Sequence, residues 1–110
     1  MTGYEREYNL RQLGLMLKTI EEYQGGLQTL RATIKKLEDL SGCLIKPFPT
    51  WLKEFQSTWG MLEDTYAVML YEKRTHLNNE EQEYVDNAIS KLTPLVQSEI
   101  NKLKKDKVES

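Results

Sequence analysis

Residues 77–103, LNNEEQEYVDNAISKLTPLVQSEINKL, carry the strongest helix signal in the chain. Asn78 is a natural N-cap, and Glu81 follows three residues later, the spacing of a capping box in which Asn replaces the usual Ser or Thr. Apolar residues then recur every three or four positions, as in a helix packed on one side. They are Val85, Ala88 or Ile89, Leu92, Val96, Ile100 and Leu103. The stripe keeps its phase across Pro94, so we expect one kinked helix rather than two helices.

Two earlier stretches show the same helical spacing. The nearer one is expected to run from Thr50, as N-cap, to about Thr75. Its apolar stripe consists of Leu52, Phe55, Trp59, Leu62, Tyr66 and Met69. A longer stripe occupies the N-terminal third and consists of Leu10, Leu13, Leu17, Ile20, Tyr23, Leu27, Leu30, Ile34 and Leu37. Strand-like alternation is missing from the sequence, so the chain is predicted to be helical.

The pair Gly25-Gly26 interrupts the N-terminal stripe, and it has two interpretations. Each glycine inside a helix costs about 1 kcal/mol relative to alanine, so the pair could end one helix before another begins. However, the stripe keeps its phase across the pair, and no capping residue follows it immediately. We therefore favour one long helix from about Tyr4 to Leu40, with a turn at the glycines as the alternative.

These segments predict an all-α fold, an antiparallel helical bundle formed by residues 1–110 as a single domain. It has three long helices, or four if Gly25-Gly26 turns the chain. Ser41-Gly42 is a stop signal for the first long helix. The connector over residues 43–49 contains two prolines, which exclude a helix there. Its apolar residues Leu44, Ile45 and Phe48 are expected to pack on the bundle.

The composition excludes several functions. Fifteen basic and seventeen acidic residues leave a net charge of −2, whereas nucleic-acid binders show a basic excess. No stretch approaches the roughly 20 apolar residues of a membrane span. Residues 1–7 carry acidic side chains where a signal peptide has a basic region. We therefore expect no nucleic acid, no membrane span and a cytoplasmic location.

The reactive residues are few. The chain has a single cysteine, Cys43, and a single histidine, His76. Glu72 and His76 are four residues apart and could share a helix face, but further metal ligands are missing. Cys43 is expected to be at least partly buried, and paired acids such as Glu21-Glu22 are expected to lie on solvated faces. The sequence therefore predicts a protein that is not an enzyme, with no catalytic residue, metal site or cofactor.

The helix that begins near Thr50 has a second apolar stripe, opposite its core face. This stripe lies around Asp64 and includes Met61, Ala67, Val68 and Tyr71. A helix in a simple bundle should present a polar back to water. Either the first helix or the connector covers this back, or the stripe is an exposed patch of the kind that binds a partner. Both interpretations remain open from the sequence.

Tyr4 and Tyr8 are one helical turn apart and could form another such patch. The sequence thus predicts a non-catalytic protein–protein interaction module with an apolar–aromatic helix face. It would work as an inhibitor, immunity protein, adaptor or chaperone. The predicted contact residues are Met61, Asp64, Val68, Tyr71, Tyr4 and Tyr8. The alternative is a structural protein that forms a homodimer without a separate ligand.

Overall fold

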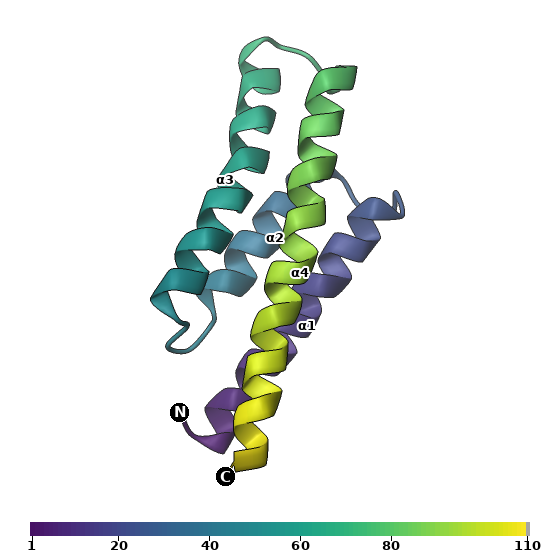
Figure 1. Cartoon of the computed structure of the whole chain (residues 1–110). Coiled ribbons are helices and arrows are strands. Elements are labelled where there is room, and N and C mark those ends of the chain that lie inside the picture. Colours follow the sequence, from purple (N-terminus) through teal and green to yellow (C-terminus); the bar gives the residue numbers. More distant parts are fainter. Residues whose placement is uncertain (110) are drawn as a thin grey trace.

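The chain folds into four helices and, in the part that the structure describes, no strands (Figure 1). The computed structural model describes the backbone of residues 1–109 and the side chains of residues 1–105. The helices are α1 (Gly3–Gln24), α2 (Leu30–Gly42), α3 (Pro49–Tyr71) and α4 (Asn79–Glu109). The predicted all-α bundle is confirmed, in its four-helix form.

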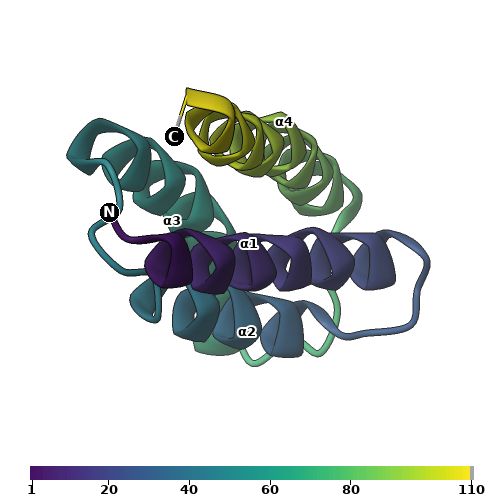
Figure 2. The same ribbon diagram turned by 90° about the horizontal axis from the view of Figure 1, so that it is seen from below.

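Each helix of the bundle packs against two others. Helices α1 and α3 both contact α2 and α4 but do not contact each other. Figure 2 shows the consequence: α1 lies along α2, while α3 and α4 form the other part of the bundle. This arrangement leaves the outer side of every helix without a neighbouring helix.

Most of the core comes from the predicted stripes, but Met16 and Trp51 are buried outside them. Leu27, predicted as a member of the N-terminal stripe, is 80% exposed, because it lies in the turn between α1 and α2. All the predicted stripe residues of α4 are buried, including both alternatives Ala88 and Ile89. The helix continues through Pro94 without a break. In α3, Phe55, Leu62 and Met69 are buried, whereas the other members of its stripe are half-buried. The periodicity of the sequence therefore correctly identified the buried side of both helices.

The single helix favoured for residues 4–40 is wrong, because the chain turns at the glycine pair. Gly26 has φ +76°, a left-handed conformation that favours glycine. Its N–H donates to the carbonyl of Tyr23 at 3.0 Å, and the N–H of Leu27 donates to that of Glu22 at 2.8 Å. Thr29 then caps α2 by accepting from the N–H of Ala32. The N-cap thus lies three residues beyond the pair, and the unbroken phase of the stripe is a coincidence of two separate helices.

Two glycine substitutions should have opposite effects on stability. Gly26→Ala is expected to lower the free energy of unfolding by about 1–2 kcal/mol, because alanine is strained at positive φ. Gly14→Ala, in the interior of α1 where an added Cβ meets nothing within 4 Å, should raise it by about 0.5–1 kcal/mol. Urea denaturation followed by circular dichroism measures both. Equal changes in the free energy of unfolding for the two substitutions would contradict the turn assigned at Gly26.

The ends of α2 and α3 differ in part from the prediction. Helix α2 ends at Gly42, within the predicted stop signal and two residues past the expected end at Leu40. Helix α3 begins at Pro49, with Phe48 rather than Thr50 as its N-cap, because proline's fixed φ suits the first helical position. It ends at Tyr71, four residues before the predicted end at Thr75. Two residues later the chain turns at Lys73, which has φ +59°.

The connector between α2 and α3 packs only partly on the bundle. Leu44 packs against the core and Ile45 is half-buried, as expected, whereas Phe48 is 48% exposed. The expectation that Cys43 is buried is wrong, because its thiol is exposed. A residue just after a helix end has no obligatory inward face, so its burial cannot be read from periodicity.

The helices differ in length, and this difference shapes the molecule. Helix α3 has 23 residues and α2 only 13, so α3 is longer by about 15 Å. The last part of α3 and the start of α4 therefore extend past α2 as a two-helix unit, seen at the top of Figure 1. The radius of gyration is 15.1 Å, against about 13 Å for a compact domain of this length. We call residues 61–86 the distal hairpin.

Candidate protein-binding site

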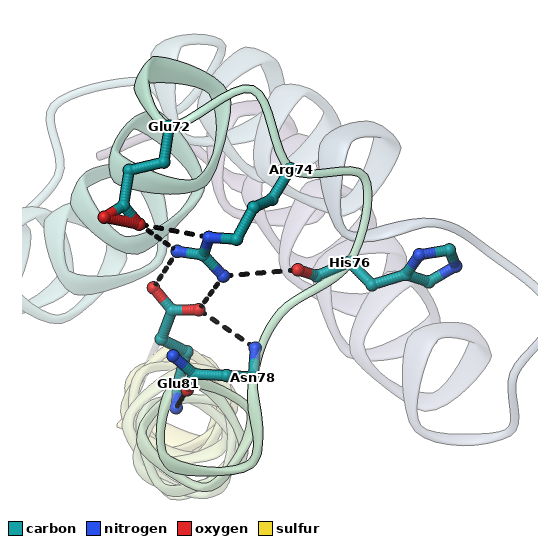
Figure 3. A network of polar contacts seen from close by, with 5 residues as sticks. All are labelled: Glu72, Arg74, His76, Asn78 and Glu81. Atoms are coloured by element: carbon teal, nitrogen blue, oxygen red, sulfur yellow. Dashed lines mark hydrogen bonds and ion pairs between the residues drawn. The ribbon is translucent and has the colours of Figure 1, made fainter.

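A bidentate ion pair holds the turn of the distal hairpin. The guanidinium of Arg74 donates to both carboxylate oxygens of Glu81, at 2.6 and 2.8 Å. It also donates to Glu72 at 2.6 and 3.0 Å and to the carbonyl of His76 at 3.3 Å. Figure 3 shows Arg74 between the two carboxylates, with the imidazole of His76 pointing away. Arg74 thus joins the end of α3 to the start of α4.

Glu81 has a second role as part of the helix cap. The N–H of Asn78 donates to Glu81 at 3.0 Å, and the N–H of Glu81 donates to the side chain of Asn78 at 2.8 Å. This is the capping box predicted from the sequence, and it is confirmed. Hydrogen bonds from Arg74, and next from the N–H of Asn78, lower the pKa of Glu81 from its ordinary 4.5 to about 2.

The depressed pKa of Glu81 predicts a defined pH dependence. A carboxyl group whose pKa is lower in the folded state stabilises the fold above its unfolded pKa, and this contribution is lost as the pH falls toward 2. The Tm of the wild type should therefore exceed that of Glu81→Gln at pH 6, and the difference should shrink between pH 4.5 and 2. Thermal melts across this range measure it. A difference in Tm that stays constant across this pH range would show that the ionised carboxylate of Glu81 does not contribute to stability.

A hollow of about 310 Å³ lies between α3 and α4 on the outer side of the distal hairpin. It is lined by Asp64, Thr65 and Val68 from α3, and by Glu80, Glu81 and Tyr84 from α4. Val68 is 50% exposed and Tyr84 46% exposed. Tyr71, three residues beyond Val68 on α3, is 88% exposed. We call Asp64, Val68, Tyr71, Glu80 and Tyr84 the outer face.

The outer face includes three of the predicted contact residues. Asp64 and Val68 line the hollow, and Tyr71 lies next to it along α3. Met61 is half-buried and packs against the core, so it contributes only part of its side chain. Neither α1 nor the connector covers this stripe, because α1 does not contact α3 and Val68 and Tyr71 remain exposed. The second stripe of α3 is therefore solvent-accessible.

The two N-terminal tyrosines are not part of the same surface. Tyr4 is 73% exposed, and Tyr8 is half-buried with the guanidinium of Arg11 at 6.0 Å from its ring centroid. Both lie at the N-terminal end of α1, opposite to the turn of the distal hairpin in Figure 1. The structure therefore separates the predicted contact residues into two groups.

The other reactive residues remain dispersed. His76 lies in the turn after α3, so it does not share a helix face with Glu72, which the sequence had left possible. Its Nδ1 is 2.9 Å from the hydroxyl of Thr75. Most members of the acidic pairs are exposed, but Glu22 and Glu81 are half-buried. Among the side chains that the structure describes, no three His, Cys, Asp or Glu residues are grouped as a metal site would require.

A larger groove, of about 740 Å³, lies between the turn after α1 and the distal hairpin. Leu30, Met69, Leu77 and Ile89 contribute apolar surface to it, and Arg31 and Asp86 are among its charged lining residues. The amide of Gln82 donates to the hydroxyl of Tyr23 at 3.2 Å and so links α4 to α1. The groove depends on the turn at the glycine pair, where the sequence had favoured a continuous helix.

Neither Tyr84 nor Arg74 was predicted from the sequence to contribute to the site. Tyr84 precedes Val85, the first core residue of α4, and lies outside the apolar stripe. An aromatic residue outside the stripe is the one signal in the sequence that could have indicated an exposed contact residue here. Arg74 gave no signal, because its partner Glu81 is seven residues away across a turn. Only the pairing of α3 with α4 brings Tyr84 next to Val68.

No family model matches the chain, and no curated protein or solved structure matches it either. Within the described residues, no helix combines the length and the apolar character needed to cross a membrane. Functional conclusions therefore depend on the geometry of the chain itself.

Proposed function

We propose that the chain is a non-catalytic protein-binding module that docks a partner protein through the outer face of its distal hairpin. The observation that carries this proposal is the exposed side chains of Val68 and Tyr84 at a hollow between two helices, with exposed Tyr71 next to it along α3. Contiguous exposed apolar surface is typical of interaction sites. Tyrosine is enriched at interfaces because it offers a large contact area and a polar tip.

We also expect the outer face to be rigid. Its residues lie on two helices, and the Arg74–Glu81 pair joins these helices beside the hollow. A surface already held in its binding conformation loses less entropy on association than a mobile loop does. Such docking suits an inhibitor, an immunity protein, an adaptor or a chaperone, which all act by covering part of another protein.

The proposal is tested by site-specific photo-crosslinking in the cells that produce the protein. A photoreactive phenylalanine at position 71 should crosslink to a discrete partner, whereas the same group at Leu15, an exposed residue of α1, should not. With the purified partner, Val68→Glu/Tyr71→Glu should weaken binding by at least about 100-fold, as loss of hot-spot contacts does. Leu15→Glu, a matched control at 47% exposure, should bind normally.

Stability measurements separate the proposal from a structural role of these residues. The Val68→Glu/Tyr71→Glu variant should keep the helicity and Tm of the wild type, because both side chains are exposed. Unfolding of this variant, or equal crosslinking from positions 71 and 15, would overturn the proposal. Sedimentation across a concentration series tests the homodimer alternative, and a monomer at high micromolar concentration would exclude it.

A further inference from the structure

We infer that the partner of the outer face is a basic protein surface, in which lysine or arginine side chains surround an apolar contact. This inference rests on the proposed function and adds the chemistry of the partner. It starts from the uneven distribution of charge. Of the 17 acidic and 15 basic residues in the chain, the distal hairpin holds seven acidic and two basic ones. The hairpin is thus acidic, while the rest of the chain is basic on balance.

Arg74 neutralises only one of the three carboxylates that line the hollow, that of Glu81. Arg74 is directed to Glu72 and Glu81. Asp64 and Glu80 line the hollow from opposite helices, both are exposed, and neither forms an ion pair among the side chains that the structure describes. The apolar surface of Val68 and Tyr84 therefore lies between two carboxylates without a counter-charge.

This combination selects one kind of occupant. Basic side chains on the partner would face Asp64 and Glu80, and charge complementarity of this type sets specificity and association rate. A guanidinium or ammonium group is also attracted to the face of a tyrosine ring, and Tyr71 and Tyr84 are accessible. A second copy of this chain is disfavoured, because a symmetric dimer through the outer face would bring the same acidic rim of both copies together.

Two synthetic helical peptides of 16 residues serve as probes. Both carry the same leucine stripe, which is flanked by lysines in one peptide and by glutamates in the other. Titration of the ¹⁵N-labelled protein should show amide shifts around Val68 and Tyr84 with the lysine peptide, at a Kd at least about 10-fold lower than that of the glutamate peptide. The difference in Kd between the two peptides should become smaller at 0.5 M salt, because salt screens exposed charges.

A charge-reversed variant makes the test specific to the rim. Asp64→Lys/Glu80→Lys should abolish or reverse the preference for the lysine peptide. The matched control, Glu21→Lys/Glu54→Lys, changes the net charge equally at exposed positions outside the hairpin and should keep the preference. Equal binding of both peptides, equal effects of the two variants, or no binding at the outer face would overturn the inference. The proposed function is judged separately, by crosslinking from position 71.

Discussion

Replacing Phe55 with alanine is expected to lower the free energy of unfolding by about 3–5 kcal/mol, the usual cost of truncating a buried aromatic residue. Phe55 is 1% exposed and its ring stacks on that of Trp51, with centroids 5.4 Å apart. The indole N–H of Trp51 donates to the carbonyl of Leu95 at 2.9 Å, so the Trp51 ring is held in place and cannot easily fill the vacancy. A domain of this size has a total stability of about 5–15 kcal/mol, so the loss is a large fraction of it.

The measurement is urea denaturation followed by circular dichroism, with Phe48→Ala as the matched control. Phe48 is 48% exposed at the start of α3, and the ammonium of Lys102 lies 5.7 Å from its ring centroid. Its truncation should cost about 1 kcal/mol, in keeping with the smaller buried area. If the two variants lost the same stability, Phe55 would not be the anchor of α3 in the core.

The second large effect is expected for Asn9→Ala, which should lower the free energy of unfolding by about 2–4 kcal/mol. The amide of Asn9, which is 3% exposed, donates to the carbonyl of Ile45 at 2.8 Å and accepts from the N–H of the same residue at 2.9 Å. Removing it leaves both backbone groups of a half-buried residue without their partner, which costs about 1–3 kcal/mol for each group. This pair of bonds attaches the connector to α1.

Asn87→Ala is the control for Asn9→Ala, because Asn87 is an exposed asparagine within α4. It should change stability by less than about 0.5 kcal/mol, since alanine also has the higher helix propensity. Circular dichroism melts of both variants under identical conditions measure the difference. A loss for Asn9→Ala no larger than that for Asn87→Ala would show that the connector is held by its apolar residues alone.

The two surfaces of the distal hairpin have a common origin in the short α2. Because α2 is ten residues shorter than the antiparallel α3, the last part of α3 packs on α4 and lacks the α2 neighbour that its first part has. The large groove lies between the distal hairpin and the turn before α2, and the hollow of the outer face lies between α3 and α4. The short α2 therefore leaves both of these surfaces accessible to solvent.

The sequence by itself determined what depends on local order. The stripe and cap of α4 lie within one continuous segment, so periodicity and the Asn78–Glu81 spacing were enough to predict its start and buried side. The core side of α3 and the existence of a second apolar stripe around Val68 follow from the same angular arithmetic. A helix rotates each residue by a constant angle, and this makes its two faces readable from the sequence alone.

Only the tertiary structure decided the features that depend on neighbours distant in the chain. The phase of the apolar stripe could not show whether Gly25-Gly26 turns, since two amphipathic helices in series can share a phase by chance. The sequence also could not show whether the back of α3 is uncovered, because its exposure depends on the length of α2 and the position of α1. Tyr84 meets Val68, and Arg74 meets Glu81, only after α3 and α4 pair. Contacts of this kind arise from packing between helices, which carries no signature in the local sequence.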